Sequence, residues 1–162
     1  MTRKVFFSFR FKSDSWRAGQ VRNIGVVEGD EPVSGNDWEE IQKKGDPNVM
    51  RWINDQLADK SCVIVLIGSD TASSRWVDYE LRRGWELNKG VLGIRIHRLE
   101  DKAGNPDIMG KNPLDKINLP DGKLMSAYVR TYDPAGKTSK EVYKTIEDNL
   151  AAWVEAAIMA RG

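Results

Sequence analysis

The sequence predicts an α/β fold, in which parallel strands alternate with helices along 162 residues. The apolar run Cys62 to Ile67 is rich in β-branched residues and too short to span a membrane, as is typical of a buried parallel strand. A polar loop and a helical pattern follow it directly, which indicates a β-loop-α unit. Because the same alternation recurs on both sides, we expect one doubly wound sheet of about five strands in a single domain, residues 1–162.

The strands are predicted from short apolar or aromatic runs that end at turn residues. They cover residues 5–9, 24–27, 62–67, 91–96 and 126–131. The helices are predicted from apolar residues at helical spacing behind capping signals. They cover residues 16–23, 47–58, 74–89 and 139–158, with Asp14 or Ser15 as the expected N-cap of the first. Residues 28–46 are expected to form a long surface loop with one helical turn near 38–41, and residues 97–120 a second long loop.

Composition excludes several classes of function. A net charge of +1 gives no bulk attraction to nucleic acid or to an anionic membrane, and no stretch is long enough to cross a bilayer. One histidine and one cysteine cannot build a zinc site, so no metal is expected. The lone Cys62 and the absence of a signal-peptide pattern favour a reducing compartment, and we expect a cytoplasmic protein.

Two residues of the helix that begins at Ser74 are candidates for a functional site. Trp76 and Glu80 lie four residues apart, so they share one helical face beside the loop 68–73. That loop follows a strand at its carboxyl end, where open α/β folds bind their ligands. Glu80 is expected at the edge of the helix's core stripe, where a carboxylate is partly desolvated and available to a ligand.

Both residues also have a purely structural explanation. Glu80 can pair with Arg83 on the helix surface, and spacing alone favours this ion pair. Trp76 can be a partly buried core residue.

The first strand supplies a second cluster. Ser8, Phe9 and Arg10 are expected at the carboxyl edge of a central strand, next to the strand 62–67. Arg10 and Arg17 can meet a phosphate, and Phe9 can stack on a base. Taken one at a time, these residues are better explained as a core phenylalanine and two solvated arginines. Their convergence on one crevice nevertheless favours a ligand-binding site.

Two other kinds of site are disfavoured. His97 ends a predicted strand, so a supporting role is favoured over that of the base in a catalytic triad. A phosphoacceptor receiver domain needs an acidic pair after its first strand and an aspartate at the end of its third. Ser8-Phe9-Arg10 and Gly68-Ser69-Asp70 occupy those places here.

Several of these segments resemble one known family. Val5 to Arg10 resembles the first strand of TIR domains, and Ser74 to Glu80 resembles their Trp-x-x-x-Glu segment. Three further segments are similar to one subgroup, the TIR-like domain of bacterial Thoeris ThsB proteins: residues 16–23, 93–97 and 110–113. The resemblance covers roughly residues 4–113 and implies a flavodoxin-like, three-layer sandwich with strand order 2-1-3-4-5.

The resemblance also implies roles for individual residues. Glu80 matches the glutamate that is catalytic in NAD-cleaving members, and Trp76 would pack the nicotinamide end of NAD. The other implied site residues are Phe9 and Arg10 in the NAD crevice, Ser69, the looser match Asp14, and Ser8 and His97 as supporting residues. Phe9 stands where TIR domains usually have tyrosine, so a role that needs the hydroxyl is lost while stacking remains.

In Thoeris defence, such proteins answer phage infection by turning NAD into a cyclic ADP-ribose-type signal that activates a separate effector. The implied partners are therefore NAD, as substrate and not as cofactor, a phage-derived trigger, and further copies of the chain in a homo-oligomer. The effector would be reached through the diffusible nucleotide. Because some members have no demonstrated catalysis, the alternative is a TIR-like adaptor that acts by protein–protein assembly.

Overall fold

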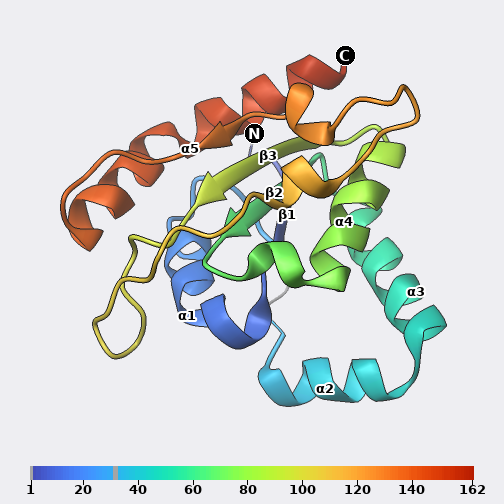
Figure 1. The fold of residues 1–162 in the computed structure, drawn as a ribbon, viewed down its shortest axis with the longest axis horizontal. Helices are drawn as coiled ribbons and strands as arrows, with labels where there is room; N and C mark the ends of the chain where they lie inside the picture. The colour runs from blue at the N-terminus through green and yellow to red at the C-terminus, as the bar shows by residue number, and fades with distance from the viewer. Residues whose placement is uncertain (1, 31–32) are drawn as a thin grey trace.

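The computed structural model describes residues 2–30 and 33–162. Its centre is a parallel four-stranded sheet in the order β1-β2-β3-β4 (Figure 1). The strands are β1 (Val5–Ser8), β2 (Cys62–Ile67), β3 (Gly90–Arg95) and β4 (Thr131–Tyr132).

Helices cover both faces of the sheet, which confirms the three-layer α/β architecture (Figure 1). One face carries α1 (Phe11–Arg22) and α5 (Ser139–Arg161), and the other carries α3 (Asp46–Leu57) and α4 (Arg75–Glu86). Strand β2 is buried along its whole length, and its alternate side chains enter the two cores in turn. This explains why its sequence is continuously apolar, since neither face of the strand meets water.

The second predicted strand, residues 24–27, is not formed. On the side of β1 away from β2, the described residues make a single parallel bridge, between Lys4 and Glu28. Beyond that bridge the Asp30 side chain takes the place of a neighbouring strand, because its Oδ1 accepts a hydrogen bond from the backbone N–H of Phe7 at 3.0 Å. The expected five strands in the order 2-1-3-4-5 are therefore not all formed: in the described part of the chain the sheet has four strands, in the order β1-β2-β3-β4, with a single bridge where the second predicted strand was expected.

The bounds of other helices and strands also differ from the predicted ones. Helix α1 begins at Phe11, five residues earlier than expected, so Asp14 and Ser15 lie inside it and the predicted N-cap is wrong. Arg10 takes the cap position without a side-chain hydrogen bond. The fifth predicted strand shrinks to β4, because Met125–Ala127 forms a 3₁₀ turn. The predicted helices at 47–58, 74–89 and 139–158 are confirmed as α3, α4 and α5.

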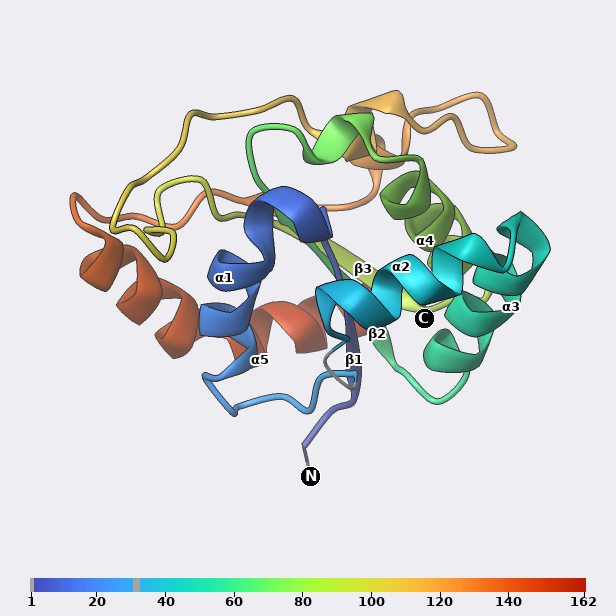
Figure 2. The same ribbon diagram turned by 90° about the horizontal axis from the view of Figure 1, so that it is seen from below.

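The segment expected to be a long loop after residue 28 contains a full helix, α2 (Gly35–Lys43), capped by the Ser34 hydroxyl. Residues 31 and 32 of that predicted loop lie outside the described residues. Figure 2 shows α2 crossing the molecule between α1 and α3. None of its residues is buried, so it lies over the core rather than in it. None of the described helices combines the length and apolarity needed to span a membrane.

Candidate active site

A cleft of about 620 Å³ opens at the carboxyl ends of β1 and β2. Three segments line it: residues 9–12 after β1, one face of α2, and residues 73–76 and 80 at the start of α4. Segments far apart in the sequence thus meet where parallel strands end, as expected for a ligand site in an open α/β sheet.

Glu80 lies in the wall of this cleft, with only 7% of its surface exposed. The Ser8 hydroxyl donates a hydrogen bond of 2.7 Å to Glu80 Oε1, so the predicted neighbours from β1 and α4 are in direct contact. Burial raises the pKa of Glu80 to about 8; the Ser8 hydrogen bond opposes this rise, and the negative charge of Asp30 adds to it. Arg83 instead bonds Glu86 and Asn54, so the surface ion pair with Glu80 is not formed.

A second, smaller hollow of about 60 Å³ lies behind Glu80. Its walls are mostly aromatic, and they carry three charged side chains: Arg22, Asp30 and Glu80. Asp30 Oδ1 also lies 3.7 Å from Arg22 Nη1. The hollow has room for a few water molecules, at about 10–15 Å³ each. Glu80 therefore borders both the large outer cleft and the small inner hollow.

The outer cleft is suited to an anionic group. Helices α1, α2 and α4 all begin at it, since Lys12, Gly35 and Arg75 in their first turns line its wall. Helix N-termini carry partial positive charge and free N–H groups, which favour phosphates. The cationic side chains of Arg10, Lys12 and Arg75 add to this field.

The remaining predicted residues of the cleft are Phe9, Arg10 and Trp76. Phe9 lines both cavities and stacks on Phe11. Arg10 is tied across the mouth of the site, because its Nη1 donates to Ser73 Oγ at 2.7 Å and its Nε lies 3.3 Å from Asp70 Oδ2. Trp76 lines the outer cleft beneath the Arg75 guanidinium, which lies 4.5 Å from its ring centre.

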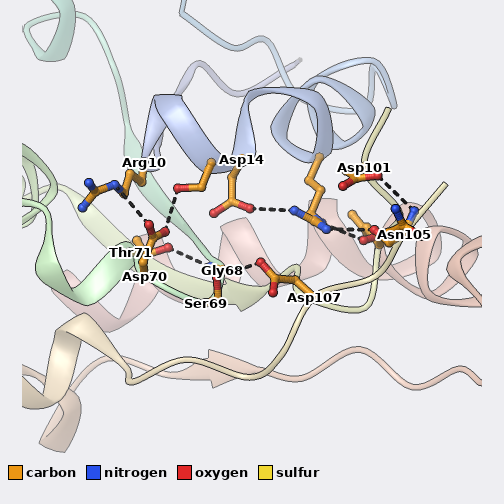
Figure 3. A network of polar contacts seen from close by, with 12 residues as sticks. Arg10, Asp14, Gly68, Ser69, Asp70, Thr71, Asp101, Asn105 and Asp107 are labelled. Atoms are coloured by element: carbon orange, nitrogen blue, oxygen red, sulfur yellow. Dashed lines mark hydrogen bonds and ion pairs between the residues drawn. The ribbon is translucent and has the colours of Figure 1, made fainter. Parts of the chain in front are cut away.

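Other predicted residues lie apart from the cleft, in a polar network that joins α1 to two loops (Figure 3). Asp14 is 1% exposed and accepts a hydrogen bond from Arg17. Ser69 donates to Asp107 Oδ2 at 2.7 Å. Burial raises the pKa of Asp14 to about 6, against the attraction of Arg17. Asp14 and Ser69 line neither cavity around Glu80.

Arg17 and His97 are also removed from the cleft. The Arg17 guanidinium donates to the carbonyl oxygens of Leu99 and Asn105 as well as to Asp14, and it is buried, so the prediction that Arg17 meets a phosphate is wrong. His97 is buried, lines neither cavity around Glu80, and has a pKa lowered chiefly by burial.

Several residues of the site were not predicted from the sequence. Those from α2 are Trp38, Glu39 and Gln42, and those beside the predicted motifs are Lys12 and Arg75; Asp30, which lines the inner hollow, was also missed. The sequence does indicate a helix here, since Ser34 is a favoured N-cap residue and Trp38 and Ile41 lie three residues apart. Nothing in that pattern indicates that the helix would lie over the end of β1.

The raised pKa of Glu80 predicts how stability depends on pH. The folded value of about 8 exceeds the ordinary 4.5, so between these values the folded protein holds a proton that the unfolded chain has released. The stabilisation is therefore full below about pH 4.5 and is lost as the pH rises through about 8. We expect the Tm of the wild type to fall, relative to that of Glu80→Gln, between about pH 5 and about pH 8.5 in thermal unfolding followed by circular dichroism. A Tm difference that is the same at every pH would contradict the assignment.

Two comparisons with known proteins agree with this architecture. The family described as Thoeris protein ThsB, TIR-like domain, matches residues 6–101, a range that contains α1, α2 and Glu80. A protein of Bacillus cereus (strain MSX-D12), named "Putative cyclic ADP-D-ribose synthase ThsB1", is 35% identical over 136 residues. The alignment covers 79% of this chain and 71% of that protein. The similarity thus extends over the segments that build the cleft.

Proposed function

Because this chain belongs to the Thoeris ThsB family of TIR-like domains, we propose that it cleaves NAD and makes a cyclic ADP-ribose-type signal in anti-phage defence. The signal would diffuse to a separate effector. The name of the Bacillus cereus relative supports this reaction class.

One observation in the structure carries the proposal: a buried glutamate faces a cleft large enough for a dinucleotide. Glu80 lies in the wall of the cleft of about 620 Å³ and is held there by Ser8. The positive ends of three helices and the side chains of Arg10 and Lys12 surround the same space. A dinucleotide brings two phosphates, which suit these groups, and a cationic nicotinamide ribosyl group, which suits a carboxylate.

Cleavage of this bond does not need a general acid to protonate the leaving group. When the bond between ribose C1′ and the pyridinium nitrogen breaks, its electron pair leaves with nicotinamide, which departs neutral. The ribose then develops oxocarbenium character, as in glycoside hydrolysis. A fixed carboxylate beside C1′, or bonded to the ribose hydroxyls, stabilises that charge, and the low local dielectric strengthens the effect. Glu80 must be ionised for this role, and the positive charge of the bound pyridinium lowers its pKa toward that state.

The acceptor decides the product. A water oxygen that attacks C1′ and loses a proton gives linear ADP-ribose. A lone pair from the adenosine half of the same molecule gives a cyclic product instead; a hydroxyl that attacks would pass its proton to Glu80. Cyclisation therefore requires that water be kept from C1′ while the substrate is folded.

The surroundings of the reaction are part of the proposal. We place the protein in the cytoplasm, where NAD and the effector are available. We also propose that a phage-derived trigger and assembly into a homo-oligomer control its activity, and that it requires no cofactor.

The direct test is to incubate the purified protein with NAD, alone and with an extract of phage-infected cells. We expect nicotinamide release and a nucleotide with the mass of cyclic ADP-ribose, both detected by mass spectrometry. The matched control is the same extract without the protein. If neither product forms in any mixture while the protein still protects cells against phage, the chain acts as an adaptor by assembly and the enzymatic proposal is wrong.

A further inference from the structure

Helix α2 presents one continuous face to the cleft. Gly35, Trp38, Glu39 and Gln42 follow the spacing i, i+3, i+4 and i+7, and all four line the cleft. No residue of α2 is fully buried. A helical stripe that faces a core is normally aliphatic, whereas this one combines an indole with a carboxylate and an amide.

Trp38 fixes this face in place and brings it near the catalytic candidate. Its ring lies 5.8 Å from that of Trp52 on α3, and both rings line the inner hollow. Trp38 and Glu80 each line both the hollow and the outer cleft, so these two side chains border the same space from α2 and α4.

The charges of the cleft are divided between its walls. The cations Arg10, Lys12 and Arg75 come from the starts of α1 and α4. The α2 face adds no cation; it adds Glu39 and Gln42, which are exposed and have no side-chain hydrogen bond within the described part of the chain. The phosphates of a dinucleotide therefore suit the first wall, and the second offers an aromatic plane with hydrogen-bond acceptors beside it.

Resting on the proposed function, we infer that the α2 face binds the adenine base of NAD, with Trp38 stacking on the ring and Glu39 accepting from the 6-amino group. Gln42 has both a donor and an acceptor for the adjoining ring edge. Bases stack well on aromatic side chains, and a carboxylate accepts well from an exocyclic amine.

This placement also gives α2 a part in cyclisation. A base held on Trp38 borders the same space as the ribose beside Glu80, so the substrate is bent and its adenosine lone pairs face C1′. The bent form occupies the space from which water would attack. The bond to nicotinamide still breaks with its electron pair on the leaving group, and the new bond at C1′ is made by the adenosine pair.

Equilibrium binding of ADP-ribose, measured by calorimetry, tests the assignment without turnover. Trp38→Ala is expected to raise the Kd roughly tenfold through lost stacking, and Trp38→Phe to restore most of the affinity. The matched control is Trp16→Ala, which removes an exposed tryptophan from α1 outside the cleft. An unchanged Kd in Trp38→Ala would overturn the inference.

Recognition of the amine is tested with the hypoxanthine counterpart, inosine diphosphate ribose, whose carbonyl oxygen replaces the amino group. The wild type is expected to bind ADP-ribose roughly tenfold more tightly, and Glu39→Gln to lose that preference. Glu40→Gln is the control, because it removes the same charge from the next residue of α2. Glu40 pairs with Lys43 and does not line the cleft. Equal binding of both ligands by the wild type would overturn the role of Glu39.

Product analysis separates this inference from the proposed function. If the wild type turns NAD over and Trp38→Ala gives the same ratio of cyclic to linear product, the α2 assignment fails and the enzyme remains. If ADP-ribose binds through Trp38 but no mixture turns NAD over, the enzymatic proposal fails and the binding face remains. A lower cyclic-to-linear ratio in Trp38→Ala supports both.

Discussion

Glu80→Gln is expected to lower NAD turnover by about 10²–10³-fold or more, because it removes the charge that stabilises the oxocarbenium-like transition state. The amide is close in shape to the carboxyl group, and its oxygen can still accept the 2.7 Å hydrogen bond from Ser8. The variant should therefore keep its fold. Nicotinamide release under identical conditions measures the effect, and circular dichroism checks the fold.

A matched control lies on the same helix. Glu86→Gln makes the same chemical change at an exposed position of α4 that pairs with Arg83. It is expected to turn NAD over at the wild-type rate. Turnover by Glu80→Gln equal to that of Glu86→Gln would remove Glu80 from the mechanism and leave the cleft without its proposed catalytic group.

Gly110→Ala is expected to destabilise the fold by about 1–3 kcal/mol, and so to lower the Tm by roughly 2–12 °C. An added Cβ would lie 2.5 Å from the carbonyl oxygen of Gly68 and would also collide with that of Ser69. Both contacts are with backbone, so no side-chain rotation relieves them. The loop must then move away from the end of β2, which strains the Ser69–Asp107 hydrogen bond and the bond from Arg95 to the Gly110 carbonyl.

Gly19→Ala supplies the comparison for this loop. Gly19 lies inside α1, and a Cβ there would meet nothing within 4 Å. Alanine is favoured over glycine in a helix by roughly 0.5–1 kcal/mol, so the Tm should rise slightly. Thermal unfolding of the two variants beside the wild type measures both effects. A Gly110→Ala protein as stable as Gly19→Ala would show that the loop after β3 is not packed on the β2 loop as described.

The centre of the site was predictable because local periodicity determines it. The apolar run of β2 predicts a strand buried on both faces, and the helical spacing after Ser74 places Trp76 and Glu80 on one face. Since parallel strands end at the same edge, Ser8 was expected near that face, and it donates a hydrogen bond to Glu80. Spacing alone had favoured an ion pair between Glu80 and Arg83. The sequence does not show which side of the core-facing stripe of α4 is covered by the rest of the protein, so it could not show that Glu80 is buried.

The rest depended on tertiary contacts that no local pattern records. A start at Phe11 instead of Trp16 keeps Asp14 and Arg17 on one buried helical face, where Arg17 is held by backbone carbonyls of the distant loop after β3. The expected second strand is not formed, because the backbone N–H of Phe7 donates its hydrogen bond to the Asp30 side chain instead of to a neighbouring strand. Helix α2 was expected as a single turn, and its position over the cleft follows from its contact with Trp52 on α3.

The most direct test of the central claim is a crystal structure of the protein with carba-NAD, an analogue whose nicotinamide–ribose bond cannot be cleaved. The account predicts that C1′ of the analogue's carbocyclic ring, or the adjoining hydroxyls, will contact the Glu80 carboxyl group, with the phosphates near Arg10 and Lys12. Binding of the analogue elsewhere on the protein, with the cleft beside Glu80 empty, would contradict it.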